Sequence, residues 1–570
     1  MENNVNDERK GIRKGLTRYG DDAFSLYVRK AFIKAMGYTD EALERPLIGI
    51  ANTYSGYNAC HATVPQIVEA VKRGVMLAGG LPIEFPIISL HESFAFPTSM
   101  FLRNLMSMDT EEMIKAQPMD AVVLIGGCDK TVPALVMGAA SANVPAIVEV
   151  TGPMLTGTHH GERVGACTDC RRFWSMYRGG EIDDVEVEEL TNELVPTAGT
   201  CGVMGTASTM ALMTEAMGMM LPGGSAIPAT YADRPRHAEL TGNRAVAMVA
   251  EGLSPDRVIT PAAVRNALRV LQAIGGSTNC LIHMTAVAGR LGIRVDLNTF
   301  DKLGQDIPVL VDLKPSGQYY MEDLHRAGGL APILRELRGY LELDALTVTG
   351  RTLGEEIDAL PPAYPQDVVK TVGAPLYPIG GMVVLRGNLA PDGAVIKQSA
   401  ANPDLLVHEG RALVFSSLED MAVRMDSSDL EVTANDVLVL QGAGPIGAPG
   451  MPEAGYLPIP KKLAEQGVKD MVRLSDARMS GTAFGTVVLH IAPESAVGGP
   501  LALVKTGDLI RLDVPNRSIE LLVDDAEIAR RRDAWKPPPV HAGSERGYLQ
   551  LYLNRVTQAP DGCDFDFLIP

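Results

Sequence analysis

The sequence predicts an α/β fold in two domains, with the active site between them. In residues 1–370, short runs rich in Ile, Val and Leu alternate with helix-length segments, a pattern typical of a parallel sheet. In residues 371–570, strand-like runs predominate, which predicts a smaller, β-rich, barrel-like domain. Proline and glycine crowd the segment LPPAYPQDVVKTVGAPLYPIGG, which predicts the boundary near residues 360–378.

Three apolar runs are the strands expected in the larger domain: PLIGIANTY (46–54), PIISLHES (86–93) and DAVVLIGGCDK (120–130). The segment TVPQIVEAVKRGVMLAGG, between the first two, has the length of a helix. Ligands of a parallel sheet bind beyond the carboxyl ends of its strands, and polar side chains fall at those ends here. They are Asn52, His91, Glu92, Cys128, Asp129 and Lys130.

Two hairpins and two single strands are expected in the smaller domain. MVVLRGNLAPDGAVIK (382–397) is predicted to be a hairpin that turns at its Pro-Asp-Gly sequence. NDVLVLQ (435–441) and KDMVRLS (469–475) are predicted to be strands. DLIRLDVPNRSIELLV (508–523) is predicted to be a second hairpin.

Three widely separated cysteines lie in glycine-rich surroundings: Cys60 in YNACHAT, Cys128 in LIGGCDKTVP and Cys201 in TAGTCGVMG. Three thiolates can hold an iron–sulfur centre and leave one iron open, which makes that iron a Lewis acid. Cys201 opens a segment predicted to be a helix, whose N-terminus would favour thiolate over thiol. The ordinary alternative for a free cysteine is a buried packing role.

Two carboxylates beside these cysteines predict a second metal. Glu92 and Asp129 offer hard oxygen ligands, which suit Mg²⁺ better than an iron–sulfur cluster. A soft site next to a hard site predicts capture of a substrate at two points. One metal would bind a carboxylate with its adjacent hydroxyl, and the cluster iron would take the next hydroxyl.

These motifs resemble the dihydroxyacid dehydratase and phosphogluconate dehydratase family of iron–sulfur hydro-lyases. The resemblance covers nearly the whole chain, in the order NTYSGYNACH, SLHESFAFPTSM, GGCDKTVPALVMGAAS, TAGTCGVMGTASTM, GGSTN, GAGPIGAPGMPE and SDARMSGTAFG. SDARMSGTAFG and GACTDCRRFW (165–174) are more similar to the sugar-acid branch, such as arabinonate and xylonate dehydratases, than to the branch that makes valine and isoleucine precursors.

The resemblance implies which residues form the site. The ligands of a [2Fe–2S] cluster, or alternatively of a [4Fe–4S] cluster, would be Cys60, Cys128 and Cys201. The Mg²⁺ shell would consist of Glu92, Asp129, Lys130 and Glu453. In this family the lysine is carboxylated on its amine, which explains a lysine where a third acidic ligand is wanted. Ser480 would be the base, with Thr482 beside it.

The implied reaction converts a 2,3-dihydroxy carboxylate, a sugar acid or a molecule as small as glycerate, to a 2-keto-3-deoxy acid. Ser480 would remove the C2 proton and the C3 hydroxyl would depart at the cluster. The alternative substrate is 2,3-dihydroxyisovalerate, the branched acid of amino-acid biosynthesis. The resemblance also implies a homodimer or a dimer of dimers.

Composition limits the other partners. The net charge of −18 argues against nucleic acid or an anionic membrane surface. The N-terminus shows no apolar secretory core, and no run of about 20 apolar residues predicts a membrane span. The seven scattered cysteines do not form a disulfide framework. These features predict a cytoplasmic location.

Other motifs have simpler explanations. Gly442-x-Gly444-x-x-Gly447 matches a dinucleotide fingerprint, but prolines disrupt the helix that would hold a pyrophosphate. The pair Cys167 and Cys170 lacks a second pair of ligands for zinc and is predicted to have a structural or peripheral role. A zinc or thiol-redox enzyme and a non-catalytic sugar-acid binding protein are the alternatives from other classes, and neither explains the hard ligands together with a serine base.

Overall fold

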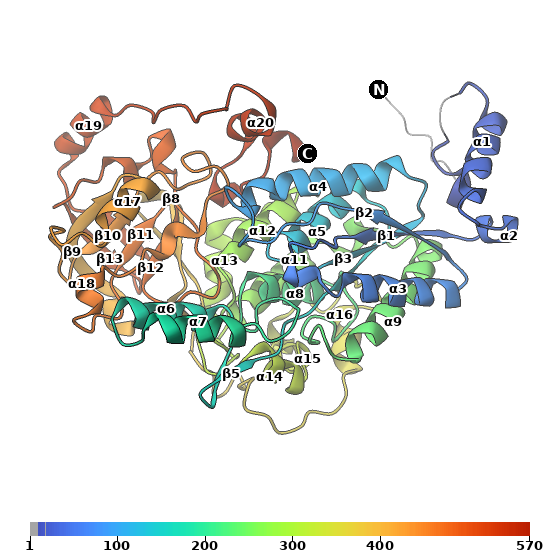
Figure 1. Cartoon of the computed structure of the whole chain (residues 1–570), viewed down its shortest axis with the longest axis horizontal. Coiled ribbons are helices and arrows are strands. Elements are labelled where there is room, and N and C mark those ends of the chain that lie inside the picture. Colours follow the sequence, from blue (N-terminus) through green and yellow to red (C-terminus); the bar gives the residue numbers. More distant parts are fainter. Residues whose placement is uncertain (1–9, 17–18) are drawn as a thin grey trace.

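The computed structural model describes residues 10–16 and 19–570, and Figure 1 shows a parallel sheet with its helices beside a closed barrel. The strand order of the sheet is β2-β1-β3-β4. Its strands are β1 (Leu47–Asn52), β2 (Leu81–Pro86), β3 (Ala121–Gly126) and β4 (Ala146–Val150). Every residue of β3 and β4 is buried, as expected where helices cover both faces of a parallel sheet.

Two pairs of helices enclose the sheet. Helices α3 (Val64–Leu77) and α9 (Asp233–Glu251) pack together on one face, and α4 (Ser99–Ala116) and α5 (Thr131–Ala142) lie on the other (Figure 1). The remaining helices before the barrel are α1 (Asp22–Lys34), α2 (Asp40–Leu43), α6 (Thr168–Arg178), α7 (Asp184–Glu193), α8 (Thr206–Ala216), α10 (Pro255–Val258), α11 (Pro261–Ala273), α12 (Asn279–Gly289), α13 (Leu297–Gln305), α14 (Met321–Arg326), α15 (Ala331–Glu336) and α16 (Leu353–Asp358). Strands β5 (Gly157–His159) and β6 (Glu162–Val164) form a small hairpin.

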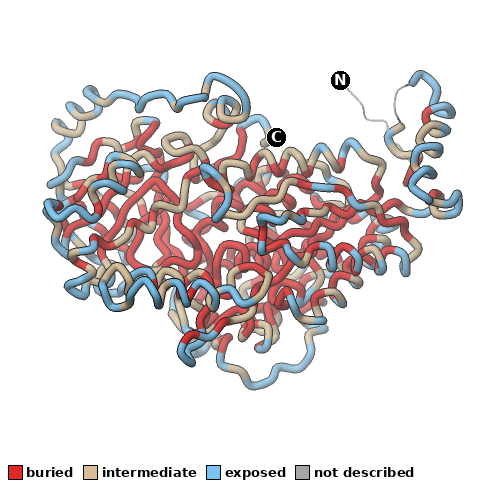
Figure 2. Tube along the Cα trace, in the orientation of Figure 1, coloured by how far each residue is buried: buried red, intermediate tan, exposed pale blue. Residues whose placement is uncertain are grey.

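Eight strands close into a barrel, in the order β10-β11-β12-β8-β7-β14-β13-β9. They are β7 (Val383–Gly387), β8 (Ala390–Ile396), β9 (Val407–Phe415), β10 (Val437–Leu440), β11 (Arg473–Ser475), β12 (Val487–Ala492), β13 (Leu509–Asp513) and β14 (Ser518–Leu521). Its helices are α17 (Leu418–Arg424), α18 (Lys461–Ala464), α19 (Asp525–Ala534) and α20 (Gly547–Arg555). Buried residues gather in the sheet and in the barrel (Figure 2), so the predicted fold class is confirmed.

The predicted strand at residues 86–93 is wrong. The strand in this region is β2, which ends at Pro86, opposite Asn52 at the end of β1. β2 pairs only with β1, so the chain leaves the sheet where β1 ends, and residues 87–93 form a loop. This loop carries His91 and Glu92, which therefore lie beyond the sheet edge rather than within a strand.

The hairpin predicted at residues 382–397 is confirmed, but its turn is at Asn388 and Leu389. The Asn388 side chain donates to the Leu521 carbonyl at 2.9 Å and accepts from the Leu521 amide at 2.7 Å. Both the nitrogen and the oxygen of the Asn388 side-chain amide are bonded to β14. These two bonds hold Asn388 in place and so fix the turn there. The Pro-Asp-Gly sequence instead lies inside β8.

A segment near residue 560 returns from the barrel to the helices of the sheet. Arg103 of α4 donates to the carbonyl oxygens of Gly562 and Cys563, at 2.8 and 2.9 Å. Arg290, at the end of α12, forms an ion pair with Asp564 at 2.6 Å, and both side chains are 0% exposed. The two parts of the molecule are thus joined by fully buried charged groups as well as by apolar packing.

Among the described residues, no helix has both the length and the apolar character needed to cross a membrane.

Candidate active site

The predicted site residues lie where loops beyond β1, β2 and β3 face loops of the barrel. Cys60 follows β1 in a short 3-10 helix, and Glu92 lies in the loop after β2. Cys128, Asp129 and Lys130 fill the turn between β3 and α5. The barrel contributes the segments after β10 and β11, which carry the remaining residues, Glu453, Ser480 and Thr482.

Four thiols gather at this place, one more than the sequence predicted. The Cys60 and Cys128 thiols and a ring nitrogen of His91 lie within 4.8 Å of one another. The sulfur of Cys201 lies 3.3 Å from that of Cys167. Hydrogen bonding to Cys128, with burial, raises the pKa of Cys60, and hydrogen bonding to Cys167, with burial, raises the pKa of Cys201. Hydrogen bonds with Cys170 and Cys201 instead lower the pKa of Cys167 well below its usual range. A cation among these sulfur atoms, as a metal centre provides, would favour the thiolate form of Cys60 and Cys201.

The sequence analysis expected a structural or peripheral role for Cys167, and its position 3.3 Å from Cys201 contradicts the peripheral one. It caps the N-terminus of α6, and the next residue, Thr168, donates to the backbone carbonyl of Thr482 at 2.9 Å. Cys167 and Cys201 are 34 residues apart in sequence and share no motif. The proximity of Cys167 to Cys201 therefore depends on a tertiary contact, which the spacing of the two residues in the sequence does not indicate. The one sequence signal that could have assigned Cys167 to the site was the motif GACTDCRRFW.

The expectation that Cys201 occupies a helix N-terminus is also wrong. Helix α8 begins at Thr206, and its N-cap is Gly205. The amides of the preceding loop bond elsewhere: Gly202 donates to the Ala166 carbonyl and Met204 to the Lys314 carbonyl, each at 2.9 Å. The helix dipole therefore does not explain any thiolate character of Cys201.

Lys130 is buried among three carboxylates. Its Nζ lies 3.4 Å from Glu92, 3.6 Å from Asp129 and 3.9 Å from Glu453, and its side chain is 1% exposed. None of these distances is within the normal range for a hydrogen bond, and the buried Nζ has no hydrogen-bond partner among the described residues. A fully buried, unbonded ammonium is costly, so this geometry suits a lysine that carries an additional oxygen-bearing group and a metal ion.

Arg478, which the sequence analysis did not assign, joins the two parts of the site. It donates to Glu92 at 2.9 Å and to Glu453 at 2.5 Å, and its side chain is 0% exposed. Burial raises the pKa of Glu92, but the charges of Arg478 and Lys130 outweigh that effect and lower it. Burial raises the pKa of Glu453. Arg478 lies within the motif SDARMSG, which is the signal that could have identified it.

Ser480 and Thr482 form a hydroxyl pair, with oxygens 2.8 Å apart. Ser480 is 8% exposed and Thr482 is 1% exposed. The glycine between them is required by close packing, because a Cβ at Gly481 would lie 2.5 Å from the Cβ of Ser277. The pair is therefore held rigidly against the GGSTN loop, a condition that suits a catalytic group.

Soft and hard donors thus lie side by side. Asp129 directly follows Cys128 in the chain, and its carboxylate lies 3.6 Å from the Lys130 Nζ, so it connects the thiols with the carboxylates around Lys130. Sulfur donors suit iron and carboxylate oxygens suit Mg²⁺. The donor set therefore fits an iron–sulfur centre and a divalent cation in adjacent positions.

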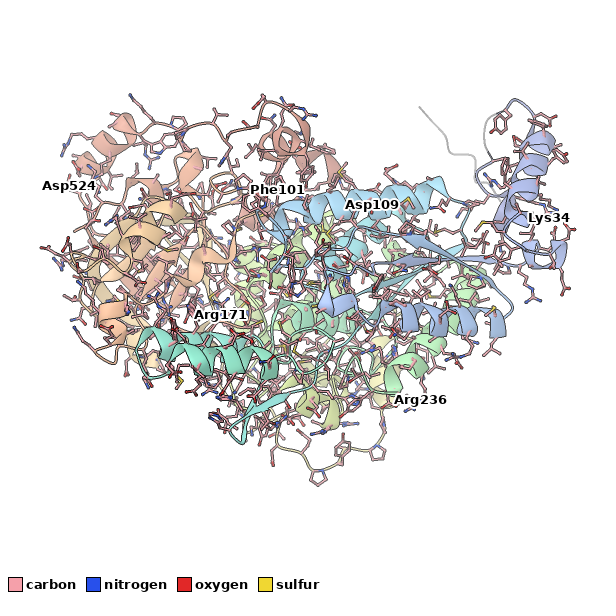
Figure 3. The ribbon with its side chains drawn as sticks, in the orientation of Figure 1. Lys34, Phe101, Asp109, Arg171, Arg236 and Asp524 are labelled. Atoms are coloured by element: carbon pink, nitrogen blue, oxygen red, sulfur yellow. The ribbon has the colours of Figure 1, made fainter. Side chains whose placement is uncertain are left out.

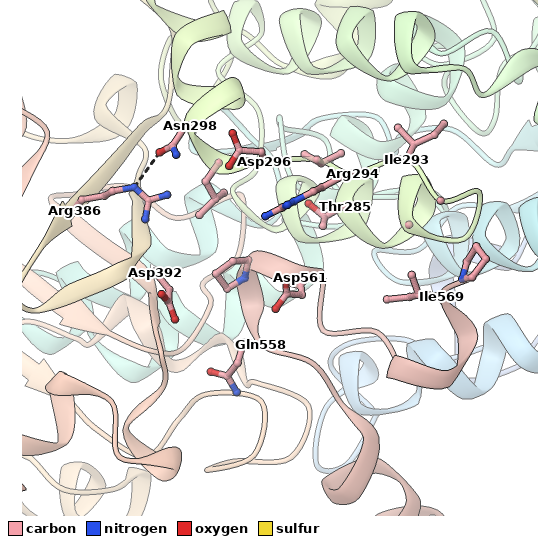
Figure 4. A pocket seen from close by; sticks show the side chains of 16 residues that line it. Thr285, Ile293, Arg294, Asp296, Asn298, Arg386, Asp392, Gln558, Asp561 and Ile569 are labelled. Carbon is pink, nitrogen blue, oxygen red and sulfur yellow. Dashed lines mark hydrogen bonds between the residues drawn. The ribbon is translucent and has the colours of Figure 1, made fainter.

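Two pockets differ in their relation to these residues. A pocket of about 460 Å³ is lined by Cys167, Cys170 and Tyr456 among others, so it opens beside two of the thiols. A larger pocket of about 790 Å³ has none of the predicted site residues in its lining. Its side chains carry both charges, including Arg294 and Asp561 (Figure 4), and it indicates no particular ligand.

Comparison with known proteins identifies the family. The N-terminal model of the dihydroxy-acid/6-phosphogluconate dehydratases matches residues 45–356, and the C-terminal model matches residues 367–563. The L-arabinonate dehydratase of Rhizobium leguminosarum is 47% identical over 96% of this chain and 95% of its own length. The 6-deoxy-6-sulfo-D-gluconate dehydratase of Pseudomonas putida is 44% identical over 96% and 95%. A dihydroxy-acid dehydratase of Acetivibrio thermocellus is 38% identical over 94% and 96%. The chain therefore belongs to the dihydroxy-acid/6-phosphogluconate dehydratase family, as its motifs predicted.

Proposed function

We propose that this protein dehydrates a sugar acid of the aldonate class to a 2-keto-3-deoxy acid. The observation that carries the proposal is the buried Lys130 among three carboxylates, directly beside four thiols. The sugar-acid dehydratases among the relatives are 47% and 44% identical to this chain, whereas the dihydroxy-acid dehydratase is 38% identical. This difference supports an aldonate over 2,3-dihydroxyisovalerate.

The donor sets indicate how two cofactors would be held. A [2Fe–2S] cluster, with [4Fe–4S] as the alternative, would be held by Cys60, Cys128 and Cys201. A Mg²⁺ ion would be held by Glu92, Asp129, Glu453 and a carboxylated Lys130. When bound, the magnesium ion would supply positive charge near the substrate carboxylate and Ser480, and the cluster would supply Lewis acidity at the departing hydroxyl.

The residues of the chain perform the proton transfer. Ser480 Oγ, once deprotonated, takes the C2 proton, and Thr482 Oγ1, at 2.8 Å, donates a hydrogen bond to that oxygen. As the C2–H bond breaks, the C3–O bond breaks, and the departing hydroxide takes up the proton that Ser480 removed, directly or through solvent. It leaves as water, and the serine is again deprotonated. The resulting enol tautomerises to the 2-keto acid, so no electrons are gained or lost overall.

A substrate panel tests this function. Protein purified without oxygen would be analysed for iron, sulfide and magnesium, then supplied with aldonic acids of three to six carbons and with 2,3-dihydroxyisovalerate. We expect 2-keto acid formation with a higher kcat/KM for an aldonic acid. A clear preference for the branched acid would assign the chain to the alternative function, and no product from metal-loaded protein would refute the proposal.

Lys130→Arg is expected to lose Mg²⁺ and turnover while keeping the visible absorption of the cluster. Arginine keeps the positive charge but cannot be carboxylated, so the site lacks an oxygen ligand and gains a cation that repels Mg²⁺. Magnesium analysis and visible spectra measure the two effects separately. Lys130→Glu restores an oxygen donor and is expected to recover part of the Mg²⁺ binding.

Lys397 offers a matched control, because it is also a 1% exposed lysine whose Nζ has no hydrogen-bond partner among the described residues. Lys397→Arg is expected to keep its magnesium. If Lys130→Arg retains both magnesium and full activity, the carboxylated lysine is excluded and Lys130 is an ordinary cation near the substrate.

A further inference from the structure

A hairpin and a helix outside the proposed active site bring two imidazoles and three carboxylates together. The hairpin consists of β5 and β6, and the helix is α7, which packs against β5 and against α6. Figure 3 shows the hairpin at the lower edge of the molecule, below the helix α6 that carries Arg171. The five side chains belong to His159 and His160 on the hairpin and, on one face of α7, to Glu186, Glu189 and Glu193.

The turn of the hairpin brings two adjacent histidines onto the same side. Neighbouring residues of an extended strand point to opposite sides, so two adjacent histidines rarely serve one ion. Here β5 ends at His159, and His160 and Gly161 form a two-residue turn with φ angles of +46° and +85°. The rings of His159 and His160 consequently stack, with their centres 3.9 Å apart.

His159 is held in the way that is usual for a metal-binding histidine. Its side chain is 4% exposed, and the edge of its ring packs on Phe173 of α6. Its Nδ1 lies 2.6 Å from Glu193, and its Nε2 lies 3.3 Å from Glu186. When Nδ1 donates to Glu193, the lone pair of Nε2 points toward Glu186. A carboxylate bonded to one ring nitrogen orients the other nitrogen as a ligand in many metal sites.

The distances between these groups fit a single ion. One ligand atom from each of His159, His160 and Glu186 lies within 4.8 Å of the other two. Two ligands of a tetrahedral zinc ion, each bonded at roughly 2.0–2.1 Å, lie about 3.3 Å apart. His159 Nε2 and Glu186 already have that separation. Glu189 lies 3.9 Å from Nε2 of the exposed His160, so a small rotation of either side chain would supply a fourth ligand.

The charges of the cluster also favour a cation. Within the part of the chain that the structure describes, no lysine or arginine forms an ion pair with the three glutamates, whose ion-pair partners are the two histidines. Even if both imidazoles were protonated, the three carboxylates would outweigh them. Imidazole suits zinc and its transition-metal neighbours, whereas Mg²⁺ and Ca²⁺ prefer oxygen ligands alone.

We infer that His159, His160 and Glu186 bind a divalent transition-metal ion of the zinc class. Glu189 is the fourth ligand, and Glu193 orients His159 through its Nδ1. None of these residues is among the proposed ligands of the cluster or of Mg²⁺, and the inference does not rest on the proposed function.

The ion would tie together two segments that lead to the thiols. β6 ends three residues before Cys167, and α7 ends eight residues before Cys201. The Ala166 amide donates to the Leu194 carbonyl at 3.2 Å, so the two segments are in contact where they leave the hairpin and the helix. Bound zinc is therefore expected to stabilise this part of the fold.

The test measures zinc binding by protein that has no affinity tag and already holds its cluster and excess Mg²⁺. Calorimetry is expected to show one zinc site with a micromolar or lower dissociation constant. X-ray absorption at the zinc edge is expected to show only nitrogen and oxygen ligands, at about 2.0–2.1 Å. His160→Gln and Glu186→Gln each remove a ligand and are expected to weaken binding by about a hundredfold. Glu193→Gln alters only the support of His159 and is expected to weaken it by about tenfold.

His325→Gln is the matched control. His325 Nε2 lies 3.9 Å from Asp233, the same separation as between His160 and Glu189, but among the described residues His325 belongs to no group that could hold a metal. This variant is expected to keep its zinc affinity. Zinc is also expected to raise the midpoint temperature of unfolding of the unchanged protein and of His325→Gln, but not of His160→Gln. His159 is left unchanged in these tests because its ring packs on Phe173.

Three results would overturn the inference. Unchanged zinc affinity in both His160→Gln and Glu186→Gln would place the ion elsewhere. Sulfur ligands at about 2.3 Å would place it among the thiols. Absence of a micromolar zinc site in the unchanged protein would show that Glu186 and Glu193 serve only as partners of a protonated His159. None of these measurements uses turnover, so their outcome is independent of the proposed function.

Discussion

Replacing Cys60, Cys128 or Cys201 by serine is expected to abolish turnover and to remove the visible absorption of the cluster. A hydroxyl is a hard, weakly acidic donor and cannot replace thiolate at iron, so each single change leaves the cluster one ligand short. Iron and sulfide analysis after anaerobic reconstitution, together with visible spectra, measures the loss directly. Cys563→Ser is a matched control, because Cys563 is 1% exposed and packs on Met451 away from the other thiols.

The double change at Cys167 and Cys170 makes this test sharper. The structure places Cys167 3.3 Å from Cys201, so proximity alone does not distinguish a ligand from a neighbour. With three ligands assigned, we expect the Cys167 and Cys170 double variant to retain iron. Retention of iron by Cys60→Ser, together with its loss from the double variant, would show that the ligand assignment is wrong.

Ser480→Ala is expected to bind both metals and the substrate, yet to lose roughly 10²–10⁴-fold or more in kcat, the usual contribution of a general base. The alanine cannot accept the C2 proton, so the variant is also expected not to exchange that proton with solvent deuterium. Steady-state kinetics and proton NMR in deuterated solvent measure these effects. They separate a failure of proton removal from a failure of binding.

Thr482→Ala is the neighbouring control. If Thr482 only donates to the Ser480 oxygen at 2.8 Å, its loss is expected to be milder than that of the base. Turnover near the unchanged level in Ser480→Ala would remove the serine from the mechanism, and an inactive Thr482→Ala beside it would make the threonine the stronger candidate.

The sequence predicted the parts of the fold that depend on local pattern. The apolar runs of β1 and β3 and the two barrel hairpins are confirmed. The prediction of a strand at residues 86–93 was wrong. The strand in this region, β2, ends where its neighbour β1 ends, and the sequence of residues 86–93 carries no information about the length of β1. β4, β5, β6, β9 and β12 were not predicted.

For the site, the sequence motifs predicted which loops of the two domains come together. They did not predict which side chains connect these loops. Arg478 and Glu92 are 386 residues apart, and their contact exists only after the barrel docks on the sheet. Cys167 was missed for the same reason. Four statements remain predictions. They are the domain boundary after residue 370, the ligand and base assignments, the cytoplasmic location, and the homodimeric or dimer-of-dimers state.

The returning segment near residue 560 has a consequence for how the molecule is made. Arg103 is 459 residues from its partner Gly562, so on a ribosome that adds about 5–20 residues per second it waits roughly 20–90 s for that partner. Arg290 is 274 residues from Asp564 and waits roughly 14–55 s at the same rate. Until those residues emerge, the guanidinium groups of α4 and α12 lack these partners. The contacts that join the returning segment to α4 and α12 are therefore completed only after nearly all of the chain has been synthesised.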